Sequence, residues 1–478
     1  MLLRHTMVYS LSRGLAGFVN LAFIVLFTRL LSPAEYGVYT LAITMVGLLN
    51  SLFFHSVRMS LMRHYEEEDK RRLMSTIFTW FHTFILIIII AAAICEAFLP
   101  FAEEHRAIWR MSLVYLWMLA WFELNLTLYR SRLEPIKYGR MFVAKYALAL
   151  CIALILVLLD WGALGLMAGM AAGTAVVVFV PSIAWWRTVR FRFVHIPLLK
   201  KLLAYGMPLT VSFTMGFLIH GSGRALLGWF DSAEAAGLYA VAYDITQQSI
   251  LMLMTVVNLA AFPIVLKKLE HQDEAAVQEQ LKKNATLLFM ISVPATAGII
   301  VLGTHIAEVF LGSEFREAAV RVLPVVAIAA FLQGAKQYYV DLSFQLAHRT
   351  SRQMMPVVIS VLVNLGLNVW WIPVWGMTGT AYAALVSHIV GLAASIHLAN
   401  RTYKLPVPAK ELAKIAAATG IMVAALLFVR SGSGLLALLA QILFGAAVYF
   451  AAAWTLKLGG TSLTPAKLFH RRQKGEAQ

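Results

Sequence analysis

The sequence predicts an all-α polytopic membrane protein with about fourteen spanning helices. Hydrophobic residues make up 60% of the 478-residue chain and charged residues only 13%, against roughly 25% charged residues in soluble domains. Apolar runs recur from Met7 to Trp454, and each has about the 20 residues that one spanning helix needs. Inside hydrocarbon, only helices and closed barrels satisfy every backbone hydrogen bond. Apolar and polar residues do not alternate along these runs as they do along barrel strands, so we expect helices.

Each apolar run predicts one helix. We expect helices at about 7–30, 38–57, 77–99, 108–130, 141–159, 164–186, 205–230, 237–266, 285–311, 319–345, 356–374, 378–400, 414–430 and 434–456. The first run carries Arg4 and Arg13 but continues to Leu30 without a small-residue cleavage site, which favours a retained span over a signal peptide. Cys95 and Cys151 lie in apolar runs. We expect both to be buried, with no disulfide, metal site or cofactor.

The basic residues predict the orientation of the spans. If the chain starts inside, about 32 of the 40 Lys and Arg residues fall on or beside the inner side. They cluster at 58–72, 130–140, 187–201, 267–283, 349–352, 401–414 and 457–474. This asymmetry is the positive-inside rule, and it predicts that both termini are cytoplasmic. The cytoplasmic placement of basic residues and their attraction to anionic lipid headgroups then account for the net charge of +16. Nucleic acid is therefore not an expected partner.

Two short segments recur in the second half of the chain. Residues 32–42 match residues 232–242 at an offset of 200, with glycine and tyrosine at equivalent places. Residues 161–165 and 375–379 both read Trp-Gly-x-x-Gly, at an offset of 214. Both matches fall on turns between corresponding predicted helices. Because six helices separate equivalent positions, the halves have the same orientation and are related by an axis along the membrane normal.

The repeat predicts how the chain is organised. Residues 1–200 form a first lobe of six helices and residues 201–402 a second, while residues 403–478 add two helices and a cytoplasmic tail. The basic stretch from Arg187 to Lys201 is the expected linker between the lobes. Transporters use such halves as two rigid lobes that rock around a central cavity.

The repeated turns also carry a family resemblance. The turn Thr28–Tyr39, which reads TRLLSPAEYGVY, and the two Trp-Gly-x-x-Gly turns resemble the polysaccharide exporters of the multidrug, oligosaccharidyl-lipid and polysaccharide exporter superfamily. The resemblance extends over the whole chain in length, helix count and half-repeat. It offers no catalytic motif to carry over, so the candidate site residues below come from physical arguments.

The resemblance implies a transporter rather than an enzyme. It implies flipping of undecaprenyl-diphosphate-linked oligosaccharide units from the cytoplasmic to the outer leaflet of a bacterial inner membrane, as in O-antigen, lipopolysaccharide and capsule assembly. Such exporters have a cationic cavity. The partners implied are the lipid-linked oligosaccharide, the membrane lipids, and polysaccharide polymerases and glycosyltransferases that act on the same material.

Ionisable side chains inside the spans are the candidate site residues. Each costs about 2.5–3.5 kcal/mol on insertion scales, so each predicts a partner or a polar cavity. The predicted substrate-binding cations are Arg29, Arg224 and Lys336. The predicted ion-coupling groups or structural partners are Glu123, Asp244, Asp341 and His220. Arg29 has an alternative, because it lies near the outer end of its helix and can snorkel to the interface. Glu123 either holds a proton or pairs with a cation.

Arg224 and Asp244 flank one outer turn. Arg224 comes seven residues before the turn and Asp244 eight residues after it, which puts both roughly 10–12 Å inside the boundary. They either form a structural salt bridge or leave Arg224 facing substrate. Two glycines beside Arg224 predict an interrupted helix at a cavity or hinge, or else close helix packing. Nearby His220 is a proton-coupling group or a hydrogen-bonded packing residue.

Lys336 lies near the middle of its predicted helix. Asp341 is five positions further on, about 140° around an α-helix, so we expect the two side chains to be poorly placed to pair. Lys336 then either supplies a cation at the midplane for a diphosphate or pairs with a group on another helix.

Three other functions compete with an oligosaccharide flippase. A cell-wall precursor flippase of the same superfamily has the same helix count. A drug or cation antiporter needs a site dominated by acidic groups, yet the intramembrane candidates include as many bases as acids. A glycosyltransferase, polymerase or ligase needs a positioned acid, base or metal and usually a large outer loop, whereas the outer turns here are short. A structural assembly partner of other membrane enzymes is the last alternative.

Overall fold

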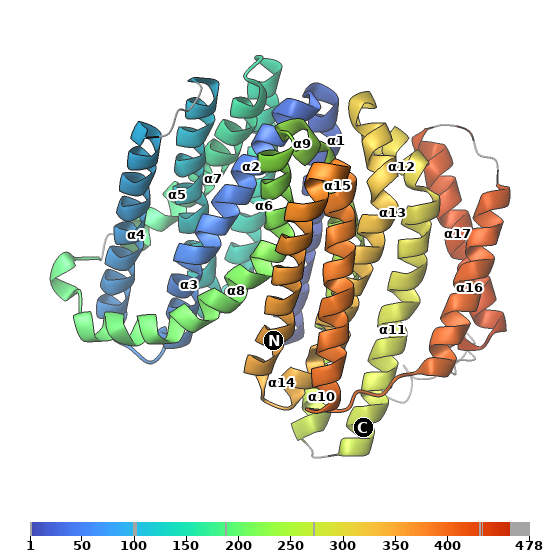
Figure 1. Ribbon diagram of the computed structural model, residues 1–478. Helices are drawn as coiled ribbons and strands as arrows, with labels where there is room; N and C mark the ends of the chain where they lie inside the picture. The colour runs from blue at the N-terminus through green and yellow to red at the C-terminus, as the bar shows by residue number, and fades with distance from the viewer. Residues whose placement is uncertain are drawn as a thin grey trace. The chain divides into compact units, whose positions relative to one another are not determined.

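The chain folds into helices over the part that the structure describes. The computed structural model describes residues 2–98, 103–186, 189–270, 273–429, 432 and 434–458, and within them there is no strand (Figure 1). The predicted basic tail beyond Leu458 and the linker residue Arg187 lie outside these residues. The all-α polytopic class predicted from the sequence is confirmed.

The helices follow the predicted apolar runs. In the first half they are α1 (Leu2–Leu30), α2 (Pro33–Leu49), α3 (His55–His64), α4 (Lys70–Phe98), α5 (Glu103–Ser131), α6 (Pro135–Leu158) and α7 (Gly162–Trp186). In the second half they are α8 (Ile196–Phe230), α9 (Ala233–Thr246), α10 (Met252–Glu270), α11 (Glu274–Val301), α12 (Gly303–Phe310), α13 (Ser313–Ala335), α14 (Leu342–Leu346) and α15 (Met354–Asn400), followed by α16 (Ala409–Phe428) and α17 (Leu435–Thr455). Short 3-10 turns lie at Phe191–Phe193 (η2) and Thr350–Gln353 (η5). Two helices start well before their predicted first residues, α8 nine residues earlier and α11 eleven residues earlier. Their polar first turns remain helical.

Twelve described elements are long and apolar enough to cross a membrane. One of them contains α15, in which Gly376 has φ 53° and ψ −133°, so that α15 is two helices joined at a kink. This is where the sequence predicts a turn. Counting α15 as two spans and adding α1, whose apolar part is Gly17–Leu30, brings the total to the predicted fourteen. The predicted helix at 285–311 is interrupted instead, since α11 ends at Val301 and α12 starts at Gly303.

Within the part of the chain that the structure describes, three spans contain a π-helical turn. The turns are η1 (Asn50–Phe54) between α2 and α3, η3 (Gln247–Leu251) between α9 and α10, and η4 (Lys336–Val340) between α13 and α14. Each turn keeps its span continuous, as at Pro33–His64. A π turn bonds residue i to residue i+5 and inserts one residue into the helical repeat, often at functional sites. Two of the turns, η1 and η3, follow the repeated segments 32–42 and 232–242.

The repeated segments contact each other. A side-chain carbon added to Gly37 would overlap the backbone oxygen of Ala233, and one added to Gly237 would overlap the backbone oxygen of Pro33 and lie 2.8 Å from the α-carbon of Gly37. The two contacts are reciprocal at the same offset of 200 that relates the sequences. Reciprocity of this kind is the signature of a twofold axis through the contact. The glycines are therefore required because two backbones approach closely here.

The Trp-Gly turns make equivalent contacts in the two halves. Gly162 has φ 49° and Gly376 has φ 53°, a conformation that side chains other than glycine rarely adopt. A carbon added to Gly162 would lie 2.5 Å from a carboxylate oxygen of Glu35, and one added to Gly376 would lie 2.9 Å from a carboxylate oxygen of Asp231. In each half, the turn after the fifth span thus lies against the turn that joins the first two spans.

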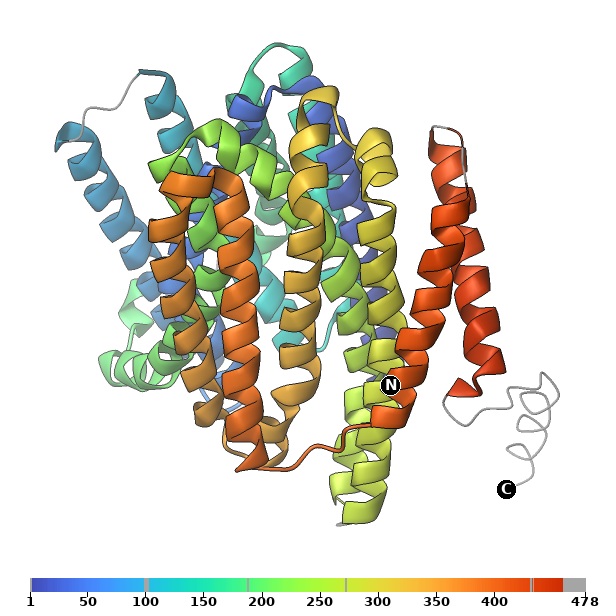
Figure 2. The same ribbon diagram turned by 45° about the vertical axis from the view of Figure 1, so that its right-hand side comes forward.

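The chain forms two compact units. The first consists of Met1–Ile245, Phe310–Val322 and Met354–Gly391, and the second of Thr246–Val309, Leu323–Gln353 and Leu392–Gln478. In the first unit α6 packs against α7 and α1, and α7 packs against α5 (Figure 1). In the second, α16 and α17 lie side by side and α16 packs against α11 (Figure 2). The lobe boundaries at residues 200 and 402 stay predictions.

The two cysteines differ from the expectation. Cys95 in α4 and Cys151 in α6 are both exposed rather than buried. In a soluble protein an apolar residue is usually buried. In a spanning helix this inference fails, because lipid-facing positions are as apolar as packed ones. An apolar run therefore does not tell which of its faces is packed.

Candidate functional site

Among the residues that the structure describes, ion pairs form at the three intramembrane carboxylates predicted from the sequence. They join each predicted intramembrane carboxylate to a basic side chain: Glu123 to Arg58, Asp244 to Arg224, and Asp341 to Lys336. Each pair lies at or next to a π turn. Arg58 also contacts the first residue of η1, Asp244 comes three residues before η3, and Lys336 is the first residue of η4.

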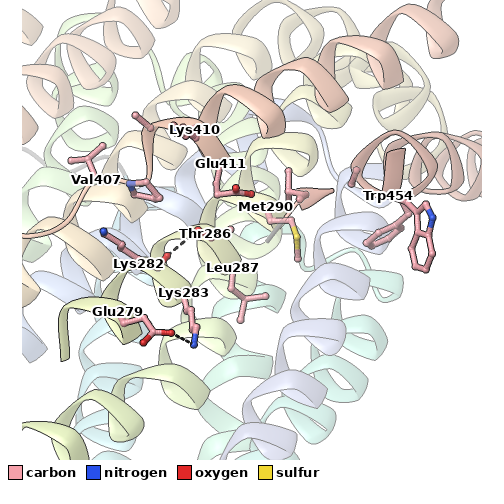
Figure 3. A pocket seen from close by; sticks show the side chains of 15 residues that line it. Glu279, Lys282, Lys283, Thr286, Leu287, Met290, Val407, Lys410, Glu411 and Trp454 are labelled. Atoms are coloured by element: carbon pink, nitrogen blue, oxygen red, sulfur yellow. Dashed lines mark hydrogen bonds and ion pairs between the residues drawn. The ribbon is translucent and has the colours of Figure 1, made fainter. Parts of the chain in front are cut away.

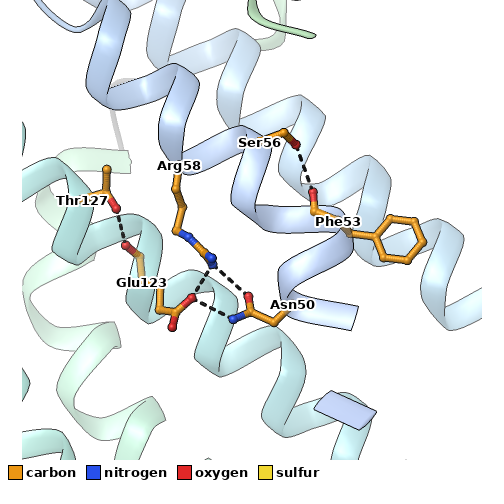
Figure 4. Close-up of polar contacts among 6 residues, drawn as sticks. All are labelled: Asn50, Phe53, Ser56, Arg58, Glu123 and Thr127. Atoms are coloured by element: carbon orange, nitrogen blue, oxygen red, sulfur yellow. Dashed lines mark hydrogen bonds and ion pairs between the residues drawn. The ribbon is translucent and has the colours of Figure 1, made fainter. Parts of the chain in front are cut away.

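The first pair is part of a three-residue cluster between η1, α3 and α5 (Figure 4). The Arg58 guanidinium contacts the Glu123 carboxylate and donates a hydrogen bond of 3.0 Å to the Asn50 side-chain oxygen. The Asn50 amide in turn donates to the same Glu123 carboxylate at 2.8 Å. The side chain of Arg58 is 9% exposed and that of Glu123 is 34% exposed. The buried Arg58 guanidinium is therefore held by two acceptors that are themselves joined by a hydrogen bond.

The structure places Arg58 inside a span, which corrects the position predicted from the sequence. The predicted span ended at residue 57, which put Arg58 among the charges of a cytoplasmic segment. The helix instead continues to His64, and Arg58 lies nearly two turns before its end. The signal that indicates this is the apolar spacing, because Phe54, Val57 and Leu61 are each at most 1% exposed and follow one helix face.

We expect Arg58→Ala to lower the free energy of unfolding by about 2 kcal/mol, because it leaves a hydrogen-bonded carboxylate without its cation. The cost stays below that of a fully buried pair because Glu123 is one-third exposed. Reversible unfolding of the purified protein in micelles measures it. Adding Glu123→Gln to Arg58→Ala should recover part of the loss. Equal stability of Arg58→Ala and the wild type would contradict the pairing.

The second pair lies between α8 and α9. Arg224 contacts the Asp244 carboxylate, and its guanidinium carbon lies 4.9 Å from the centre of the Tyr243 ring. The hydroxyl of Tyr243 is 2.6 Å from Nδ1 of His220. The side chain of Arg224 is 11% exposed and that of Asp244 is 29% exposed. The structure thus brings three predicted residues, Arg224, Asp244 and His220, into one polar group.

The glycines beside Arg224 do not interrupt the helix. α8 runs without a break through Gly221 and Gly223, so of the two alternatives that the sequence left open, an interrupted helix or close helix packing, the structure shows close packing. A carbon added to Gly221 would lie 3.0 Å from Thr44, and one added to Gly223 would lie 2.9 Å from Thr380. Both glycines therefore allow neighbouring helices to approach closely, as small residues do between spanning helices.

The third pair corrects a geometric expectation. Lys336 Nζ lies 2.8 Å from Asp341 Oδ2, although an α-helix would separate the two side chains by about 140°. The reason is η4, in which the backbone amide of Asp341 donates to the carbonyl of Lys336 at 2.8 Å. That i→i+5 bond adds one residue to the turn and brings positions five apart onto one face.

The Asp341 carboxylate is buried and surrounded by donors. It is 1% exposed. Besides Lys336 it accepts a hydrogen bond of 2.7 Å from the Ser395 hydroxyl and one of 3.1 Å from the Gln353 amide. Lys336 neutralises the buried carboxylate and the two neutral donors satisfy its oxygens, as a charge in a low-dielectric interior requires. The Lys336 side chain is 11% exposed.

The remaining predicted cation stands apart from these pairs. Arg29 lies in the last turn of α1 and is exposed. Its backbone lies against the turn at Gly312, where an added carbon would be 3.2 Å from the α-carbon of Arg29. Arg29 is a member of neither the Arg224 nor the Lys336 pair.

Lys145 is a buried cation that the sequence pattern did not single out. It lies in α6, is 3% exposed, and its ammonium nitrogen is 4.3 Å from the ring centre of Tyr146, 5.4 Å from that of Phe122 and 6.0 Å from that of Tyr115. Aromatic ring faces stabilise a desolvated cation by about 2 kcal/mol or more. The aromatic neighbours on α5 and α6 are the signal that could have indicated it.

Among the contacts that link distant segments near the helix ends on the basic side, those of Glu68 and Tyr403 involve shifted pKa values. Lys201 donates a hydrogen bond of 2.7 Å to Glu68, and this bond holds the pKa of the Glu68 carboxyl below its usual value. Tyr403, between α15 and α16, donates a hydrogen bond of 2.7 Å to Glu274. Burial, with a further contribution from that carboxylate, raises the pKa of Tyr403 to about 12. Both contacts persist at neutral pH.

Comparison with known proteins identifies the family. Residues 26–320, more than half of the chain, match the family model described as polysaccharide biosynthesis protein. The chain belongs to that family. The matched segment includes both repeated turns at residues 32–42 and 232–242 and the Arg58 and Arg224 clusters. It ends before Lys336.

The chain also resembles one curated relative in sequence and two solved structures in fold. The chain is 27% identical over 198 residues to the probable low-salt glycan biosynthesis flippase Agl15 of Haloferax volcanii, and the match spans 41% of each protein. It resembles the structure of the lipid II flippase MurJ in an inward closed conformation, with a TM-score of 0.79, 16% identity and coverage of 94% of this chain and 99% of that one. An inward-facing multidrug resistance MATE family transporter of the MOP superfamily gives a TM-score of 0.65 at 14% identity, over 81% of this chain and 96% of that one.

Proposed function

We propose that the protein flips undecaprenyl-diphosphate-linked oligosaccharide units from the cytoplasmic to the outer leaflet of a bacterial inner membrane, with its termini in the cytoplasm. The product serves surface polysaccharide assembly such as that of O-antigen, where polymerases and glycosyltransferases act before and after it. The observation that carries the proposal is membership of the polysaccharide biosynthesis family through residues 26–320. The name of Agl15 as a flippase in glycan biosynthesis supports the same substrate class.

The intramembrane ion pairs suggest how a diphosphate is accommodated. A diphosphate needs cations when it leaves water, because its charge is costly in a low dielectric. Arg224 and Lys336 are each held by one carboxylate, which keeps the empty protein neutral at these positions. We propose that the substrate diphosphate takes the place of Asp244 or Asp341 as the partner of the cation. When the substrate leaves, the carboxylate recovers the cation and the site returns to its starting state.

The same pairs argue against a cation antiporter. Such a transporter needs a carboxylate that exchanges a proton for a cationic substrate. Each of the three predicted intramembrane carboxylates already has a basic partner. Alternating access around the cationic groups, without a covalent step, is therefore the mechanism that we propose.

The test is a leaflet-accessibility assay in proteoliposomes. It compares lipid-linked oligosaccharide, cell-wall precursor and a cationic dye. We expect movement of the lipid-linked oligosaccharide between leaflets at a rate well above that of protein-free vesicles. Transport of the dye without movement of either lipid would overturn the proposal, and movement of the cell-wall precursor alone would reassign the substrate.

In the same assay we expect Arg224→Gln with Asp244→Asn to slow flipping at least tenfold, which corresponds to about 1.4 kcal/mol. These substitutions remove both charges and keep hydrogen-bonding groups, so the fold is retained. The matched control removes an exposed ion pair, Arg110 with Glu96, by changing both residues to Gln. Equal flipping by the Arg224 and Arg110 variants would remove Arg224 from the site while leaving the flippase proposal intact.

A further inference from the structure

The second unit contains a cavity that none of the candidate site residues lines. It has a volume of about 890 Å³ and lies between α11, the start of α16 and the end of α17 (Figure 3). Its lining includes Lys282 and Lys283 of α11 and Lys410 in the first turn of α16. The opposite part is apolar and includes Phe450 and Trp454. The cavity is therefore basic on one side and apolar on the other.

Two of its lysines lack a carboxylate partner. Lys283 pairs with Glu279 at 2.5 Å, and the other acidic lining residue, Glu411, is held by Lys414 at 3.0 Å. The two carboxylates at the cavity are thus neutralised. Lys282 and Lys410 take part in none of the ion pairs among the described residues, which leaves two ammonium groups free for an anion. Figure 3 shows both on the side of the cavity away from Trp454.

The apolar side of the cavity is exposed, and it lines the same cavity as these cations. The exposed fractions are 38% for Leu287, 62% for Phe450 and 54% for Trp454. Tryptophan near the end of a spanning helix marks the level of the lipid headgroups. Cations at that level with apolar side chains next to them fit a molecule whose anionic head is joined to hydrocarbon chains. The first turn of α16 also lacks a side-chain cap, so its backbone amides favour an anion there.

We propose that this cavity binds an anionic diacyl phospholipid, with its phosphate on Lys282 and Lys410 and its acyl chains along Leu287, Phe450 and Trp454. The occupant that we propose is a membrane phospholipid, and the transported lipid is the alternative that the competition arm below tests. The inference stands independently of the proposed transport function. It assigns the two added helices, α16 and α17, a role in fixing the protein to its bilayer.

The test measures binding to the full-length protein in detergent. Native mass spectrometry, with thermal unfolding alongside it, compares dioleoyl-phosphatidylglycerol with dioleoyl-phosphatidylcholine, which differ only in headgroup. We expect the wild type to prefer phosphatidylglycerol and Lys282→Ala with Lys410→Ala to bind it about 30-fold more weakly, which is about 2 kcal/mol for two lysines. The control, Lys200→Ala with Lys267→Ala, removes the same charge from helix ends outside the cavity and should bind like the wild type.

Three results would overturn the proposal. The first is equal binding of the two phospholipids by the wild type. The second is an equal loss of binding in the cavity variant and the control, which would indicate general surface charge. The third comes from a competition arm with undecaprenyl diphosphate: if the cavity variant binds it more weakly but binds phosphatidylglycerol normally, the cavity belongs to the transported lipid. Trp454→Ala, in contrast, should weaken both phospholipids alike if the acyl chains lie where we place them.

Discussion

Asp341→Ala should lower the free energy of unfolding by about 3–5 kcal/mol, because it leaves the buried ammonium group of Lys336 without its counter-charge. Asp341 is 1% exposed and accepts hydrogen bonds from three side chains. Its loss therefore also leaves the Ser395 hydroxyl and the Gln353 amide without an acceptor. Reversible unfolding in mixed micelles measures the loss.

A double variant separates structure from transport at this pair. Replacing a buried ion pair with apolar residues of similar volume is often neutral or stabilising, so Lys336→Met with Asp341→Leu should be more stable than Asp341→Ala alone. If Lys336 binds substrate, the folded double variant should not flip the lipid-linked oligosaccharide. Full flipping by the double variant would show that the pair is purely structural. Stability as low as that of Asp341→Ala would contradict the pairing itself.

Gly37→Ala should lower the free energy of unfolding by roughly 3 kcal/mol, because the added methyl group overlaps backbone that cannot move aside easily. The atom in its way is the carbonyl oxygen of Ala233, and the amide and α-carbon of Gly37 itself lie against Gly237. Gly237→Ala should cost a similar amount, because the contact is reciprocal. Unfolding in micelles and the yield of monodisperse protein both report the change.

Gly216→Ala is the matched control for these glycine variants. Nothing lies within 4 Å of a carbon added at Gly216, which is in the helix α8. Alanine there should raise stability by about 0.5–1 kcal/mol through its better helix propensity. A loss at Gly216 as large as that at Gly37 would mean that glycine matters in these helices for a reason other than close backbone contact.

The helices could be predicted from the sequence because a membrane imposes a simple rule. A span needs an apolar run of fixed length, and the runs were long enough that the fourteen predicted spans each have a counterpart in the structure. The repeated turns could also be found, because a glycine at a close backbone contact tolerates no substitution. Gly37 and Gly237 therefore keep their identity where the surrounding apolar residues have diverged. Gly162 and Gly376 keep theirs because both have a positive φ.

The polar clusters were harder to predict, because their geometry depends on distant partners. Arg58 follows an apolar run and so resembles a charge that ends a span, but Glu123 neutralises it from another helix. The pairing of Lys336 with Asp341 depends on η4, and hydropathy does not distinguish a π turn from an α turn. Lys145 is stabilised by aromatic rings, which apolar patterning does not separate from ordinary packing.

The reciprocal contact between the two glycine turns has a consequence for the origin of the chain. Two surfaces that contact each other through equivalent residues are self-complementary, and a self-complementary surface is what joins two identical subunits into a symmetric dimer. A six-helix protein carrying one such turn could associate with its own copy, in the same orientation in the membrane, through the contact that Gly37 and Gly237 now make. Fusion of two copies would then convert a dimer interface into a contact between two halves of one chain. Either copy of the turn remains constrained by the other, although the rest of the two halves is free to specialise.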